Sequence, residues 1–121
     1  MTVQDHLQRA TELDRIARLT IDGGKRRDLW FRAGQAYEAA AATLQAAGQE
    51  DAADAPAMLR RAALLAREAA SRYRAAGEPA VASQVGVIAD QLEAQAAGLV
   101  ERRRQAELRD RQFDRAVNAP R

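Results

Sequence analysis

Two matching segments decide the fold: residues 30–48, WFRAGQAYEAAAATLQAAG, and residues 59–77, LRRAALLAREAASRYRAAG. In each of them large apolar residues and alanines recur at alternating steps of three and four, which places their side chains on one face of an α-helix. Each segment closes on Ala-Ala-Gly, and glycine accepts the left-handed conformation in which helices often end. The chain therefore contains an internal repeat made of two long helices, which we expect over residues 26–47 and from about residue 56 to residue 76.

A further helix is expected on each side of this repeat. The first covers residues 3–20, where Thr2 and Asp5 come close to a capping box and Asp22-Gly23-Gly24 is expected to end the helix. Its predicted apolar stripe is Val3, Leu7, Ala10, Leu13, Ile16, Ala17 and Leu19. The last helix begins near residue 80, after Gly77-Glu78-Pro79, and its predicted stripe is Val81, Val85, Ile88, Leu92, Gln95 and Leu99.

The helix lengths predict how the domain is organised. Helices of this length span about 32 Å at 1.5 Å per residue, so an antiparallel fourth helix of equal length would reach the end of the bundle near Arg102. We therefore expect four antiparallel helices in residues 1–101, with the last helix extending beyond them as a charged segment over residues 102–121. An acidic loop over residues 49–55 is expected before the third helix, and residues 118–121 are expected to fray.

Composition favours helix and argues against a membrane protein. Alanine, the best helix former, makes up about a quarter of the 121 residues, and cysteine is absent. No apolar run approaches the roughly 18 residues of a membrane span, and residues 1–9 lack the apolar core of a signal peptide. These features predict a cytoplasmic protein. The bias toward arginine over lysine is typical of a GC-rich bacterial genome, and the net charge of +2 is too small to call for nucleic acid.

The repeat resembles the tetratricopeptide (TPR) superfamily. The opening W-x2-L-G-x2-Y of that pattern is matched by Trp30, Ala33, Gly34 and Tyr37, with alanine in the leucine position. Its second half is matched by Ala69, Tyr73, Ala76 and Pro79, with tyrosine in place of phenylalanine. The two halves lie farther apart than in a 34-residue TPR, as in long-helix proteins similar to soluble NSF attachment proteins. The resemblance implies stacked helical hairpins that bind proteins, and it implies no catalytic residue.

Motifs that would carry catalysis are incomplete. Gly23-Gly24-Lys25 is similar to a phosphate-binding loop, but Leu19 stands where the first glycine belongs and Arg26 follows the lysine. His6 is the only histidine, which excludes paired-histidine metal sites and a Ser-His-Asp triad within the chain. Asp51 and Asp54 lack the pattern of a calcium-binding loop. We therefore expect no catalytic, cofactor or metal site, no small-molecule substrate and no enzyme activity.

Partner binding is the remaining class of function. Neighbours on a helix diverge by about 100°, so Phe31 cannot share the stripe of Trp30, and it either packs on the first helix or stays exposed for docking. The candidate partner-binding residues are Phe31, Arg60, Arg61, Arg102, Arg103, Arg104, Ala106, Phe113 and Val117. The last three form a weak apolar stripe that suits a partner helix or a second copy of the chain.

The sequence therefore predicts a non-catalytic protein–protein interaction module, an adaptor or scaffold subunit of a bacterial assembly. Two alternatives remain open. A small nucleic-acid-associated protein would bind backbone phosphate through the arginine clusters, and that binding would weaken steeply with salt. A structural homo-oligomer would instead associate with itself.

Overall fold

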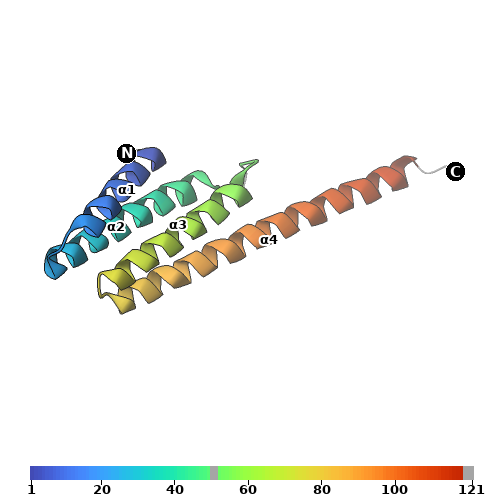
Figure 1. Cartoon of the computed structure of the whole chain (residues 1–121). Coiled ribbons are helices and arrows are strands. Elements are labelled where there is room, and N and C mark those ends of the chain that lie inside the picture. The colour runs from blue at the N-terminus through green and yellow to red at the C-terminus, as the bar shows by residue number, and fades with distance from the viewer. Residues whose placement is uncertain (50–51, 119–121) are drawn as a thin grey trace.

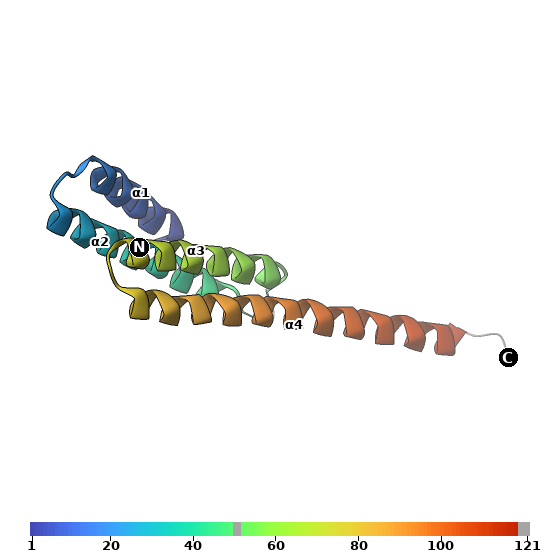
Figure 2. The same cartoon turned by 60° about the horizontal axis from the view of Figure 1, so that its bottom comes forward.

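The chain folds into α-helices that pack in the order in which they occur. The computed structural model describes residues 1–49 and 52–118, and these residues form four helices and no strand. The helices are α1 (Val3–Leu19), α2 (Gly23–Ala47), α3 (Ala55–Ala75) and α4 (Pro79–Asn118). Helices that are consecutive in the chain pack on each other, α1 on α2, α2 on α3 and α3 on α4 (Figures 1 and 2). The prediction of an all-α chain with four helices is confirmed.

Capping side chains decide where the first two helices begin. The Thr2 hydroxyl accepts the N–H of Asp5 at 3.1 Å and the Asp5 carboxylate accepts the N–H of Thr2 at 2.9 Å, so the predicted capping box is present. These bonds lower the pKa of Asp5. The first helix ends at Leu19, one residue before the expected end, but the role expected of Asp22-Gly23-Gly24 is wrong. Asp22 caps α2 by accepting the N–H of Lys25 at 2.8 Å. Gly23 and Gly24 consequently lie in the first turn of α2.

The turn from α3 to α4 depends on one glycine. Gly77 has a φ of +77°, and the N–H of Glu78 donates to the carbonyl of Tyr73 at 2.9 Å. A side chain is strained at such a φ, so the predicted stop at Gly77 is confirmed. Pro79 is the first residue of α4. Glu50 and Asp51 of the predicted acidic loop, and residues 119–121 of the predicted frayed end, lie outside the described residues.

Alanine dominates the interior. On α3 the positions predicted to be buried at residues 59, 62, 66, 69 and 73 are all buried, and only one of them, Tyr73, is aromatic. Leu59 and Leu92 are the largest side chains that are almost completely enclosed among the described residues. Small side chains let helix axes approach closely, so these helices rely on close contact along their length rather than on a few large apolar groups.

The closest approach joins α2 to α3. A Cβ atom at Gly34 would lie 3.0 Å from two carbon atoms of the Tyr73 ring. The ring of Phe31 meets the Tyr73 ring edge-on, with centroids 5.3 Å apart. The Tyr73 hydroxyl donates to Glu38 at 2.5 Å, which fixes the far end of the ring. Gly34 is therefore needed for space.

Parts of the predicted stripes on the other helices are wrong. On α1, Ile16 and Leu19 are exposed, whereas the side chain of Asp14 is buried. On α2, Ala47 is exposed. On α4 the alanines at 82, 89 and 96 are buried, whereas Ile88 and Gln95 are exposed and Val81 is half-buried. Alanine prevails on α4 because it allows α4 to lie close against α3. We call the buried face of α4 the α4 seam: Ala82, Val85, Ala89, Leu92, Ala96 and Leu99.

The last helix is much longer than its neighbour. With 40 residues α4 spans about 60 Å, whereas the 21 residues of α3 span about 32 Å. Figure 1 shows the carboxyl-terminal half of α4 running on alone past the other helices. Residues 104–118, which we call the overhang, are all exposed. Within the described residues, none of the helices has both the length and the apolar character that crossing a bilayer requires.

Two glycine substitutions test the close approach. We expect Gly34→Ala to lower the free energy of unfolding by about 1–3 kcal/mol, because the added methyl group would press on a Tyr73 ring that is held on several sides. Gly86→Ala, also inside a helix, meets nothing within 4 Å and should raise that free energy by about 1 kcal/mol through helix propensity alone. Urea unfolding followed by circular dichroism measures both. Equal effects of the two substitutions on the free energy of unfolding would contradict the close packing of Gly34 against the Tyr73 ring.

Candidate functional site

The α4 seam continues unbroken into the overhang. Its buried positions are spaced at alternating steps of three and four residues from Ala82 to Leu99, the heptad spacing of helices that pack along their length. The same steps then reach Arg103, Ala106, Asp110, Phe113 and Val117. The face of α4 that packs on α3 in the bundle is therefore the face that carries the predicted stripe in the overhang.

Apolar side chains on this continued face are open to solvent. Phe113 is 68% exposed and Val117 is 63% exposed, and Ala106 is exposed as well. Leu108, two residues past Ala106, lies about 200° around the helix from it and faces away from the seam. An exposed phenylalanine on a helical stripe is a typical anchor for a partner helix. The overhang is therefore the strongest candidate for a binding surface in this chain.

Arg103 marks the point at which α3 stops covering α4. Its guanidinium donates to the carbonyl of Ala53 at 2.8 Å and to that of Ala52 at 2.5 Å, just before α3 begins. Arg103 thus serves the fold by holding the start of α3 against α4. Arg60 and Arg61 lie exposed in the second turn of α3. Where α3 begins, Arg103 holds α3 and α4 together. Arg104 belongs to the exposed overhang.

Phe31 contacts a third helix, which was not among the positions expected for it. It is half-buried against the core, and its ring contact is with Tyr73 of α3 rather than with a residue of α1. The contact arises because Gly34, one turn farther along α2, lets the Tyr73 ring come close. Phe31 consequently contributes to the packing of α2 on α3.

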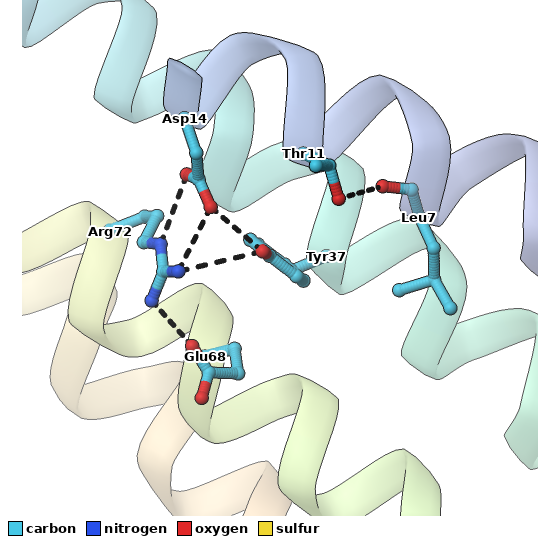
Figure 3. A network of polar contacts seen from close by, with 6 residues as sticks. All are labelled: Leu7, Thr11, Asp14, Tyr37, Glu68 and Arg72. Atoms are coloured by element: carbon cyan, nitrogen blue, oxygen red, sulfur yellow. Dashed lines mark hydrogen bonds and ion pairs between the residues drawn. The ribbon is translucent and has the colours of Figure 1, made fainter. Parts of the chain in front are cut away.

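A buried polar network crosses three helices (Figure 3). Arg72 of α3 reaches Asp14 of α1 with two bonds, from Nε to Oδ1 at 3.1 Å and from Nη2 to Oδ2 at 2.9 Å. The hydroxyl of Tyr37, on α2 between them, donates to Asp14 Oδ2 at 2.8 Å. Arg72 also lies over the Tyr37 ring, 4.8 Å from its centroid, and pairs with Glu68 on its own helix. One network therefore links α1, α2 and α3.

The groups in this network bond to one another. The bonds to Asp14 raise the pKa of Arg72, and burial together with the bond to Asp14 raises the pKa of Tyr37. Among the described residues, no fully enclosed side-chain nitrogen or oxygen lacks a hydrogen-bond partner. In the same part of the chain, no three histidine, cysteine or acidic side chains gather closely enough to hold a metal ion. The arrangement suits a structural clamp between helices.

This network was not predicted from the sequence. A signal was present, since Asp14 interrupts the apolar stripe of the first helix between Leu13 and Ala17. A charged residue on a buried face needs a partner, but the partner, Arg72, lies on a different helix far along the chain. Nothing in the local pattern distinguishes it from the exposed arginines.

Removing the acidic partner tests the clamp. We expect Asp14→Ala to lower the free energy of unfolding by about 3 kcal/mol, because it leaves the largely buried guanidinium of Arg72 without its main partner. Glu12→Ala is the matched control on α1: it removes an exposed pair with Arg15 and should cost less than about 1 kcal/mol. Chemical unfolding measures both variants. Similar losses for the two would show that the network contributes little.

The buried tyrosine makes stability depend on alkaline pH. Burial and the hydrogen bond to Glu38 raise the pKa of Tyr73 above its ordinary value of 10.0. Its stabilising contribution is therefore fully present below about pH 10 and is lost as the pH rises through the folded-state pKa. We expect the free energy of unfolding to begin to fall at about pH 10, so that it is lower at about pH 11 than at about pH 8. In the double variant Tyr37→Phe/Tyr73→Phe, which lacks both tyrosines, the fall should be much smaller. Equal free energies of unfolding of the wild-type chain at about pH 8 and about pH 11 would contradict this expectation.

Comparisons of the chain with models of known protein families, with curated proteins and with solved structures found no match. A functional proposal for this chain therefore rests on its own helices and on the surface of the overhang.

Proposed function

We propose that this chain is a non-catalytic protein–protein interaction module that binds a partner protein through the overhang of α4. It would serve as an adaptor or scaffold subunit of a bacterial assembly in the cytoplasm. The single observation that carries the proposal is the continuation of the α4 seam beyond α3, where Phe113 and Val117 are largely exposed. Burying two such side chains against a partner contributes a few kcal/mol to binding.

We further propose that the helices form TPR-like antiparallel hairpins. Support comes from the contacts between consecutive helices and from the contact of Phe31, near the start of α2, with Tyr73, near the end of α3. Arg103 of α4 in turn meets the residues just before α3. An array of few hairpins leaves its terminal helices covered on one side only. In this chain the terminal helices are α1 and α4, and α4 also carries the overhang.

The non-catalytic part of the proposal is supported by the interior. Asp14, which is buried, and Tyr37 and Arg72, which are partly buried, bond to one another across three helices. These bonds hold the helices together.

Truncation tests the proposed function. Deleting residues 105–121 removes only residues that are exposed wherever the structure describes them, so the free energy of unfolding should change by less than about 1 kcal/mol. The same deletion should abolish association with the partner. Unfolding is followed by circular dichroism, and association by quantitative affinity capture from extracts of the source organism with mass spectrometry.

Two point variants in the full chain sharpen the test. Phe113→Asp places a charge on the exposed stripe and should remove the partners that the truncation removes. Leu108→Asp makes the same kind of change on the opposite side of the overhang and should leave them bound. Partners that survive both the truncation and Phe113→Asp would contradict the proposal, and so would a truncated chain that no longer folds.

The two alternatives give different results in the same samples. Phosphate binding through the arginine clusters would weaken steeply as salt is raised, whereas an apolar helix contact would not. A structural homo-oligomer would show a multiple of the 13.2 kDa chain mass in light scattering of the purified protein. Either result in place of a Phe113-dependent partner would favour the corresponding alternative.

A further inference from the structure

Charged side chains of α3 and α4 meet along one edge of the α4 seam. Arg67 of α3 binds Glu93 of α4 and lies 3.1 Å from the carboxylate of Asp90, and it lowers the pKa of Glu93. Arginine recurs every seventh residue along α3, at 60, 67 and 74. Arg74 shares a shallow hollow with Arg67 and with Gly86, which is seven residues before Glu93. Along this edge, α3 presents a basic row to α4.

The acidic side of that pattern continues where α3 is absent. Counting in sevens from Glu93 along α4 gives Val100, Glu107 and Asp114. The last two lie on the overhang, beyond the point where Arg103 meets the carbonyls that precede α3. Arg109 lies on the other edge of the continued seam. The overhang therefore carries an apolar stripe with Glu107 and Asp114 on one edge and Arg109 on the other, and Glu107 also pairs with Arg111 on its own helix at 2.8 Å.

A second copy of the chain fits this surface poorly. A copy running parallel to α4 along the seam would place its own residues 79–101 in the space that α3 occupies. A copy running antiparallel would avoid α3, but in antiparallel helix pairs equivalent edge rows face each other. Glu107 and Asp114 would then meet the same two acidic residues of the copy, and such like-charge contacts are repulsive.

The direction of the bound helix follows from the start of α3. Helix N-termini carry a partial positive charge and C-termini a partial negative charge. The N-terminus of α3 and the guanidinium of Arg103 both lie where the overhang begins. A helix in line with α3 and running in the same direction would bring its negative end toward the N-terminus of α3 and Arg103, with the carboxylate of Asp54 at the same junction.

We propose that the overhang binds an amphipathic helix of a different protein, which continues the line and direction of α3. It places small and apolar residues over Ala106, Phe113 and Val117, basic residues opposite Glu107 and Asp114, and an acidic residue opposite Arg109. A polar group must also face Asp110. This residue lies on the continuation of the α4 seam and would otherwise lose its solvation without gaining a partner. This inference rests on the proposed function and names the chemistry of the partner.

Two synthetic helical peptides of identical composition test the proposal. Both carry alanine and leucine on the seam face, with one asparagine opposite Asp110. Peptide X has arginines on the edge that faces Glu107 and Asp114 when it runs in the direction of α3, and glutamates on the other edge. Peptide Y has the two edges exchanged. Binding to the full chain is measured by fluorescence anisotropy of the labelled peptides. Peptide Y can pair its arginines with Glu107 and Asp114 only by running in the opposite direction, so we expect X to bind about two- to fivefold more tightly than Y.

Variants of the full chain locate the effect. Glu107→Arg/Asp114→Arg should reduce the affinity for peptide X by about tenfold, with helicity checked by circular dichroism. Glu101→Arg is the matched control, because residue 101 lies on the side of α4 away from the seam, and it should leave the binding of X unchanged. Equal or tighter binding of Y, no binding of X, or unchanged binding of X to the double variant would overturn the proposal.

Failure of this inference differs from failure of the proposed function. If natural partners depend on Phe113 while peptide X shows no preference, the overhang is a binding surface but its partner has another chemistry. If natural partners are indifferent to Phe113, the proposed function itself is wrong, whatever the peptides do.

Discussion

The close approach of helices lined with alanine is the constraint on which this structure depends. An alanine side chain contributes little buried area, so the helices gain stability only if their backbones come near enough for continuous contact. Gly34 shows how little space is left, since even a methyl group there would press on the Tyr73 ring. A single larger residue on such a face would separate two helices along their length. The same small residues therefore set both the spacing of the helices and their tolerance to change.

The polar network adds specificity to this uniform packing. Alanine faces are much alike, and by themselves they discriminate poorly between one sliding position and another. The two bonds from Arg72 to Asp14, with Tyr37 between them, can form only when three helices stand in one relation to each other. Buried polar residues are known to fix the register of helices in this way in some systems. In this chain they set the position of α1, which carries no large buried apolar residue.

Local rules predicted much of the helical framework, and contacts between distant residues decided the rest. The capping box at Thr2, the stop at Gly77 and the buried face of α3 follow from residues near one another in sequence. The burial of Asp14 does not, because its partner is far along the chain. The phase of the stripe on α4 was misjudged because Ile88 is more apolar than Ala89, yet close packing on α3 selects the smaller residue. The apolar stripe of the overhang was visible in the sequence, but its continuity with the interface to α3 was not.

The repeat along α4 also determines the path of anything that follows it. Seven residues make slightly less than two full turns of a straight α-helix, so positions spaced in sevens drift by about 20° per repeat. From Ala82 to Val117 the drift accumulates to roughly a quarter turn. A partner helix that follows this face from the start of α3 to the C-terminal end of α4 must wind around α4 as a left-handed supercoil. It would leave the layer formed by α3 and α4, and the assembly would extend out of the plane of its helices.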